Sequence, residues 1–310
     1  MRRVVAASIT ATVLCGLAVP VSAADLDDLE EYLRDAAGAE FSGRQVVMTY
    51  WGDEAAAGIY EVTQSGGTTT IHAGDDTVII GAGAFETRRG DDDHYQLVPE
   101  WTSWYIDDRY TIGDVERVQR IGRPATLVTV LEGDVVRLRL AFDVATGAPL
   151  LSETLDDDGD IYRMAAMLDL DDAPEPMPAY GSEESVAMPI TGAVDLPATA
   201  GGYRLADVYG SPDTTVQAFY TDGLFAFSVF QVDGQADDGP FEDADRWDLG
   251  GRTYLVLTDP GGVQLFWRSP DASFVLVGDP PPDHLEEVLR DLPRPGRANF
   301  FTRLWRRLFG

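Results

Sequence analysis

Histidine is the side chain that most often serves as a general base near neutral pH, and this chain has three: His72, His94 and His284. Nucleophilic catalysis needs such a base beside the nucleophile. However, no G-x-S-x-G sequence occurs, and no two histidines have the H-x-x-x-H spacing of a helical zinc site. We expect His284 on the surface of a helix, His72 at a strand end and His94 after an acidic run. The sequence therefore predicts no catalytic residue, no metal site and no cofactor.

Carboxylates are the most abundant titratable groups. The chain has 53 Asp and Glu residues against 23 basic residues, for a formal net charge of −30. Such a field repels phosphate backbones and argues against nucleic-acid binding. The run 156–160 contains four aspartates, but Ile161 stands where a calcium loop of the EF-hand type needs glycine. We interpret this run as a solvated hairpin turn, and we base no glycosidase hypothesis on any single carboxylate pair.

The N-terminus has the pattern of a secretory signal peptide. Met1-Arg2-Arg3 precedes an apolar stretch over residues 4–19, and Val21-Ser22-Ala23 supplies the small residues at which signal peptidase cuts. We expect cleavage after Ala23 and export to the periplasm or another extracytoplasmic site. The single cysteine, Cys15, would be removed with this segment. The mature chain would then contain neither a disulfide nor a reactive thiolate.

The elements that must position any site change from helical to strand periodicity near residue 40. A helix is predicted between Asp25 and Gly38, and its apolar face holds Leu26, Leu29, Leu33 and Ala36. Strand patterns with period two follow at 43–50, 58–63, 68–72, 77–80, 115–121, 125–131, 135–143, 150–154 and 161–168. We expect the polar run 88–93 to interrupt the series, and Arg137 and Arg139 to lie on a solvated strand face. This pattern predicts an α+β domain whose antiparallel sheet curls around the helix.

A change in composition divides the chain. Residues 171–197 are rich in Asp, Glu, Pro and Ser, which is typical of a linker. Strand patterns resume at 203–209, 216–220, 224–232, 252–258, 263–268 and 273–277. A run of three prolines ending at Pro282 then begins a helix whose apolar face holds Leu285, Val288, Leu289 and Leu292. The second half is therefore also predicted to be α+β, with a smaller antiparallel sheet.

Three segments, in this order along the chain, resemble motifs of the RseB/MucB family. The first runs from Ile121-Gly122-Arg123-Pro124-Ala125 through the strand 137–143 to the hairpin 146–150. The second is the hairpin 217–230, which turns at Thr221-Asp222-Gly223. The third is the strand-to-helix junction 275–281. Each motif alone is common, but the ordered set spans residues 25–290.

The resemblance implies a fold, a partner and a set of boundaries. Members of this family join an N-terminal LolA-like half-barrel to a smaller α+β domain. They regulate sigma-E-type systems by binding the extracytoplasmic part of a membrane anti-sigma factor, until envelope damage or a lipid-type ligand releases it. We therefore expect a signal peptide (1–23), a LolA-like domain (24–170), an acidic linker (171–197), a C-terminal domain (198–294) and a tail (295–310). The alternative to a non-enzymatic regulator is a lipid or lipoprotein carrier of the cell envelope.

Two groups of residues are the candidates for binding. An aromatic group lies near the mouth of the implied half-barrel, where it could line a lipid cavity or simply pack the sheet: Phe85, Tyr95, Trp101, Trp104, Tyr105 and Tyr110. The hairpin of the second motif supplies candidates for a partner or domain interface, with core packing as the alternative: Tyr220, Asp222, Gly223, Phe225, Phe227 and Phe230.

The C-terminal tail differs from the rest of the chain because it is basic and aromatic. Its residues with helical spacing on one face are Phe301, Leu304, Trp305 and Leu308, and they alternate with Arg303, Arg306 and Arg307. Such a helix is typical of attachment to a membrane surface, here the outer face of the cytoplasmic membrane, or of docking to an acidic partner. The alternative is packing against the acidic body of the same chain.

Overall fold

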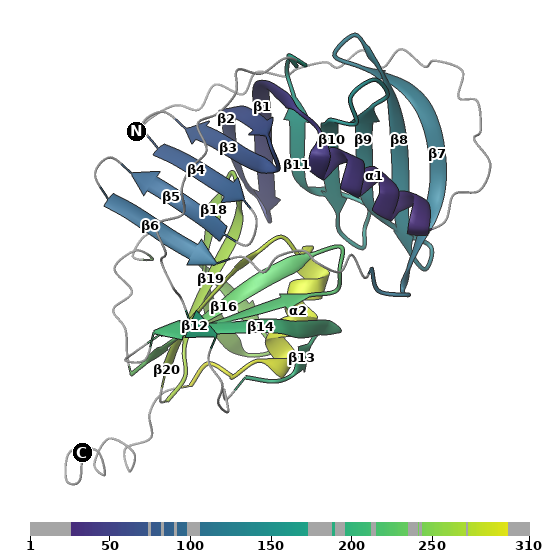
Figure 1. The fold of residues 1–310 in the computed structure, drawn as a ribbon. Coiled ribbons are helices and arrows are strands. Elements are labelled where there is room, and N and C mark those ends of the chain that lie inside the picture. The colour runs from purple at the N-terminus through teal and green to yellow at the C-terminus, as the bar shows by residue number, and fades with distance from the viewer. Residues whose placement is uncertain are drawn as a thin grey trace, which may run out of the picture.

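The computed structural model describes residues 26–73, 76–81, 84–89, 92–97, 106–172, 188–189, 196–211, 215–234, 241, 244–270 and 272–296. These residues form two antiparallel sheets, each accompanied by one helix (Figure 1). The predicted α+β class is confirmed. The signal-peptide pattern and all but the first two residues of the tail lie outside the described residues, as does most of the predicted linker.

The N-terminal sheet has eleven strands in the order β6-β5-β4-β3-β2-β1-β11-β10-β9-β8-β7. Its helix is α1 (Leu26–Gly38), and its strands are β1 (Phe41–Trp51), β2 (Glu54–Ser65), β3 (Thr68–Ala73), β4 (Asp76–Gly81), β5 (Ala84–Arg89), β6 (Asp92–Leu97), β7 (Tyr110–Arg120), β8 (Arg123–Glu132), β9 (Val135–Asp143), β10 (Pro149–Leu155) and β11 (Ile161–Met167). The first and last strands of the meander, β1 and β11, pair with each other. The sheet therefore joins two hairpin series at its middle.

The C-terminal sheet has nine strands, with β12-β14-β15-β16-β20-β19-β18-β17 in order and β13 beside β14. Its strands are β12 (Met188–Pro189), β13 (Thr199–Ala200), β14 (Tyr203–Ser211), β15 (Thr215–Thr221), β16 (Ala226–Asp233), β17 (Asp245–Leu249), β18 (Arg252–Asp259), β19 (Gly262–Arg268) and β20 (Ala272–Gly278), and its helix is α2 (Pro282–Asp291). Every pairing is antiparallel.

Helix α1 lies across strands β7–β10 and closes one side of the N-terminal sheet (Figure 1). Its buried residues Leu29 and Ala36 belong to the same hydrophobic cluster as Val128 and Leu140 of the sheet. Tyr32 stacks on Phe142, with ring centroids 5.5 Å apart. Gln64 donates to the carbonyls of Ala36, Ala37 and Ala39 at the end of the helix. Side chains of the sheet therefore bury the apolar face of α1 and also satisfy its last carbonyls.

Helix α2 covers one face of the C-terminal sheet. Pro282 begins it, where a missing N–H costs no helical hydrogen bond. Leu285, Val288 and Leu289 are almost fully buried in the same cluster as Val229, Leu265 and Leu276 of the sheet. The apolar face predicted for this helix is confirmed.

Three local predictions need correction. The polar run 88–93 does not interrupt the sheet, because β5 and β6 pair across it from Ala84 to Leu97. Strand β17 was not predicted, because Asp245, Arg246 and Asp248 mask its alternation. Met188–Pro189, inside the predicted linker, pairs with β14. In all three cases backbone pairing with a neighbouring strand outweighs a polar or proline-rich local sequence.

The aspartate run between β10 and β11 forms the predicted turn. The side chain of Asp156 accepts the backbone N–H groups of Asp158 at 3.1 Å and Asp160 at 2.9 Å. Within the described part of the chain, no cluster of three or more carboxylate, histidine or cysteine side chains is arranged to hold a metal ion. Neither described helix is both long and apolar enough to cross a membrane.

Candidate functional site at the contact between the two sheets

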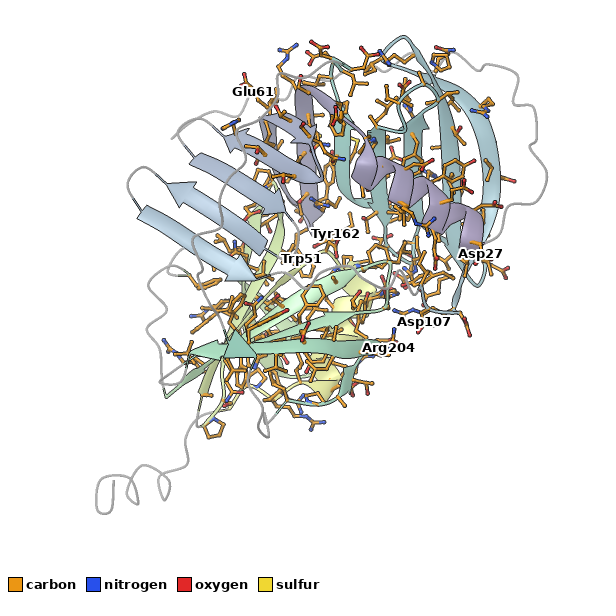
Figure 2. All side chains as sticks on the ribbon, in the orientation of Figure 1. Asp27, Trp51, Glu61, Asp107, Tyr162 and Arg204 are labelled. Atoms are coloured by element: carbon orange, nitrogen blue, oxygen red, sulfur yellow. The ribbon has the colours of Figure 1, made fainter. Side chains whose placement is uncertain are left out.

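The turn between β15 and β16 reaches across to the N-terminal sheet. Gly223 has φ of +90°, which an L side chain rarely adopts, so glycine suits this turn. The Oδ1 atom of Asp222 accepts the N–H groups of Leu224 at 2.9 Å and Phe225 at 2.8 Å. The backbone carbonyl of Asp222 accepts the N–H of Asp107 at 2.9 Å. One aspartate therefore shapes its own hairpin and joins it to the segment before β7; Figure 2 labels Asp107 at this position.

The second carboxylate oxygen of Asp222 is held entirely by the N-terminal side. Its Oδ2 atom forms an ion pair with Arg109 and accepts the hydroxyl of Tyr110 at 2.7 Å. Burial, followed by the charge of Asp222, raises the pKa of Tyr110, so this hydroxyl stays protonated and donates. The guanidinium of Arg109 lies 5.0 Å from the ring centroid of Tyr110 and 5.2 Å from that of Tyr203. The charge of Asp222, 1% exposed, is compensated by a cation held between two rings.

Glu132, at the end of β8, is the centre of an adjoining set of contacts. Its Oε2 atom accepts Nε of Arg137 at 2.8 Å and contacts Nε2 of His284 at 2.9 Å. The hydrogen bond from His284, the largest cause, together with Arg137, lowers the pKa of Glu132 to about 2. Glu132 also lies 3.7 Å from Nε of Arg109, so it connects this set to the Asp222 contacts.

Arg137 was predicted to lie on a solvated strand face, and this prediction is wrong. It is 6% exposed, and its guanidinium makes two parallel hydrogen bonds to Asp283 of α2, at 3.1 and 2.7 Å. Such bidentate pairing fixes both distance and orientation. Arg137 was predicted to face solvent because strand alternation cannot show that a helix 146 residues away lies over this end of β9.

His284 was predicted to lie on the surface of a helix. This prediction is also wrong, because His284 is only 3% exposed. Its Nδ1 lies 2.8 Å from the hydroxyl of Tyr203. Because the ionised Glu132 can only accept, Nε2 of His284 carries the proton and donates to it. In the neutral ring Nδ1 then accepts the hydroxyl of Tyr203, so both ring nitrogens have partners. His284 thus links β14 and α2 to Glu132 of the N-terminal sheet.

These eight side chains are referred to below as the interface network: Arg109, Tyr110, Glu132, Arg137, Tyr203, Asp222, Asp283 and His284. The network contains three carboxylates and two guanidiniums, and its donors and acceptors come from both sheets in about equal number. Its chemistry is that of a polar joint: Asp222 and Asp283 each pair with an arginine of the N-terminal side. Glu132 pairs with Arg137 of its own sheet and contacts His284 across the joint, so the joint depends on the relative placement of the two sheets.

A second, aromatic contact lies beside the network. Trp51 of β1 meets Trp247 of β17 edge to face at 5.0 Å and Tyr162 at 6.3 Å. Thr49, fully buried, donates to the carbonyl of Pro260 at 3.1 Å. In Figure 2 Trp51 and Tyr162 lie at the end of the N-terminal sheet that faces the C-terminal sheet. Apolar area therefore adds to the polar joint, and the two contacts together resist rotation about either one.

The structure distributes the predicted interface residues among different roles. Phe225 contacts Tyr110 at 6.1 Å and His284 at 6.1 Å, next to Asp222 and Gly223. Tyr220 and Phe227 stack at 4.9 Å inside the C-terminal sheet. Phe230 lies on the sheet face opposite α2, by its register with Val275. Sequence analysis missed six residues of the interface network: Arg109, Glu132, Arg137, Tyr203, Asp283 and His284. Of these, Asp283 and His284 directly follow the proline run that marks the start of α2.

The predicted aromatic cavity falls mostly outside the described residues. This applies to Trp101, Trp104 and Tyr105, and to the side chains of Phe85 and Tyr95. Tyr110 is described, fully buried, and belongs to the interface network. A separate cavity of about 520 Å³ lies at the other end of the N-terminal sheet, between the end of α1 and the β9–β10 hairpin; Arg34, Asp35, Arg117 and Thr146 are among its lining residues.

Comparison with known proteins identifies the fold of this chain. No family model matches the chain, and no curated protein matches it. Among solved structures, the complex of Pseudomonas aeruginosa MucA/MucB matches with a TM-score of 0.50 and 21% identity, covering 88% of this chain and 100% of that one. MucB in complex with MucA(peri) gives 0.47 and 20%, covering 87% and 99%. MucB alone gives 0.46 and 19%, covering 86% and 98%. The resemblance noted in the sequence is therefore confirmed as a structural match: over 88% of its length the chain has the fold of the MucB chain in that complex.

Proposed function

We propose that this chain is an exported, non-enzymatic regulator that binds the extracytoplasmic part of a membrane anti-sigma factor. The observation that carries the proposal is the likeness of the two-sheet arrangement to MucB, whose solved complex contains MucA. The signal-peptide pattern at 1–23 supports export. Two of the three motifs that suggested the family lie in strands that pair: β16 of the 217–230 hairpin pairs with β20, which leads into the 275–281 junction.

We propose the β15–β16 hairpin as the element that couples partner binding to the placement of the two sheets. The turn of the hairpin is fixed to Arg109 and Tyr110 through Asp222. Its strand β16 carries Phe230 on the face away from α2. A partner that binds this hairpin in one arrangement of the sheets better than in another shifts the equilibrium between them. Removing one member of a buried ion pair costs about 3–5 kcal/mol, so the network can separate two such arrangements.

We further propose that a lipid-type ligand acts on the same joint. The predicted aromatic segment, which includes Trp101, Trp104 and Tyr105, continues directly into Asp107, Arg109 and Tyr110. A ligand bound by those aromatic side chains would displace the residues that contact Asp222. Release of the partner would then follow from loss of the Arg109–Asp222 pair, with no contact between ligand and partner.

The test is purification of the mature protein from its own envelope, followed by native mass spectrometry, lipid extraction and identification of proteins that co-purify. Recovery of a membrane protein with one span and an extracytoplasmic domain supports the regulator. Recovery of lipid without such a protein supports the carrier, and recovery of neither contradicts both. An Asp222→Asn variant, with Asp248→Asn as a matched exposed control, then tests the joint: we expect lower retention of the partner for Asp222→Asn only.

A further inference from the structure

The C-terminal sheet has a second apolar face. Helix α2 covers one face, and an antiparallel sheet with a single covered face normally carries polar residues on the other. Here the register places Phe230, Val275, Phe266 and Leu255 in one row across β16, β20, β19 and β18 on the face away from α2. A neighbouring row alternates Val277 and Leu257 with the polar Ser228 and Gln264. Such a face is stable in water only when something covers it.

The cover seen among the described residues is incomplete. Phe241 stacks on Phe266 at 5.1 Å, and the guanidinium of Arg268 lies 5.4 Å from the centroid of the same ring. Beside them Phe230, Leu255 and Val275 are half-buried, and Val277 is 37% exposed. The contact with the N-terminal sheet uses the other face: Trp51 meets Trp247, which pairs with the buried Tyr254 of the α2 side.

The chain leaves the second helix toward this apolar face. After α2, the carbonyl of Pro293 accepts the indole N–H of Trp267 at 2.7 Å. The N–H of Gly296 then donates to the carbonyl of Arg268 at 2.9 Å. Arg268 lies on the apolar face beside Phe266, so Gly296, the last described residue, lies at the edge of that face.

We propose that residues 299–309 dock as an amphipathic helix across this face of the C-terminal sheet. Eleven residues of helix span about 16 Å, and the four strands from β16 to β18 span about 14 Å between the outer strand axes. The apolar face of the tail, Phe301, Leu304, Trp305 and Leu308, matches the apolar rows in chemistry. Its arginines find a carboxylate at one side of the face, Asp207 on β14.

Disulfide trapping tests this docking, because the one cysteine of the chain, Cys15, lies in the expected signal peptide. The pair Val277→Cys with Leu304→Cys joins the exposed sheet position to the apolar side of the tail. Two controls match it: Val277→Cys with Arg306→Cys uses the polar side of the same helix, and Ile59→Cys with Leu304→Cys uses an equally apolar residue of the N-terminal sheet, 63% exposed. A docked tail raises the effective concentration of the two thiols, so we expect intramolecular oxidation about 10-fold faster than in either control.

The outcomes separate the alternatives. Equal rates in all three pairs overturn the proposal, and so do disulfides that form mainly between chains, which would make the face a contact between copies. Co-sedimentation of the full mature chain, but not of a chain ending at Gly296, with phosphatidylglycerol vesicles would, together with slow trapping, assign the tail to membranes instead. A second pair, Leu257→Cys with Leu308→Cys, repeats the test without altering Val277. None of these results depends on the proposed partner.

Discussion

Glu132 lies at the end of a strand, yet it accepts hydrogen bonds from Arg137 of its own sheet and from His284 of the other. We therefore expect its charge to contribute to the stability of the fold. We predict that Glu132→Gln lowers the free energy of unfolding by about 2 kcal/mol, because two charge-assisted hydrogen bonds lose their anion. Denaturant unfolding measures the change. Glu286→Gln is the control, since its pair with Arg290 is exposed and contributes only about 0.5 kcal/mol or less. Equal effects of the two substitutions would contradict a central role for Glu132.

The same carboxylate predicts a pH dependence. Its folded-state pKa is about 2, below the ordinary value of 4.5, chiefly because His284 donates to it. A lowered pKa means that the stabilisation is fully present above pH 4.5 and is lost as the pH falls toward 2. We therefore expect the stability difference between the wild type and Glu132→Gln to be largest above pH 4.5 and to shrink below it. Urea midpoints measured from pH 7 to pH 2 give this difference, and a constant value across the range would rule the mechanism out.

Single residues also show the limit of sequence reasoning. Asp222 and Gly223 were predicted as a turn with a possible interface role, because turn chemistry is local. Arg137 and His284 were assigned to solvent, because their burial depends on partners 146 and 152 residues away. Nothing in the spacing of the chain marks those pairs. The charged residues at the start of α2 are the one local sign, since Asp283 and His284 follow a proline run that already fixes where the helix begins.

The hydrophobic period of the sequence and its turn residues predicted most strands and both helices. The failures are β5, β6 and β17, whose sequences contain several charged residues, and the two short strands β12 and β13. A strand at or near a sheet edge keeps its backbone pairing while its side chains meet water, so hydrophobic alternation is not required there. Such strands become evident only once the neighbouring strand is known.

The packing of α2 on the C-terminal sheet depends on a close approach at one glycine. Gly201 has φ of +56°, and a Cβ atom there would lie 2.7 Å from the backbone nitrogen of Val288. Gly250 has φ of +58° with open space around it, so it is a matched control. We predict that Gly250→Ala costs about 1 kcal/mol through its backbone conformation alone, whereas Gly201→Ala costs a further 1–3 kcal/mol, roughly, because the helix must move. Equal losses of stability for the two variants in thermal or urea unfolding would show that α2 moves without an energetic cost.

At the scale of the whole molecule, the two sheets are joined by a polar contact and an aromatic one that differ in character. The aromatic contact of Trp51 with Trp247 is tolerant of small shifts, because dispersion falls gradually with distance. The interface network does not tolerate such shifts, because hydrogen bonds to charged groups need defined distances and angles. A change in the relative placement of the sheets would therefore break the network before it separates the aromatic rings. This makes the network the sensitive part of the joint.

Asp222→Asn isolates that sensitivity. Asparagine keeps an acceptor for the N–H groups of Leu224 and Phe225, so the hairpin retains its turn, but it presents no charge to Arg109. We predict that the wild type unfolds in one calorimetric transition, because the two sheets are coupled, and that Asp222→Asn unfolds in two, because Arg109 is left uncompensated at the contact. Asp248→Asn, which alters an exposed carboxylate bonded to Thr253, should keep a single transition. A single transition in Asp222→Asn, with its midpoint unchanged, would mean that the aromatic contact alone couples the sheets and that the network does not set their placement.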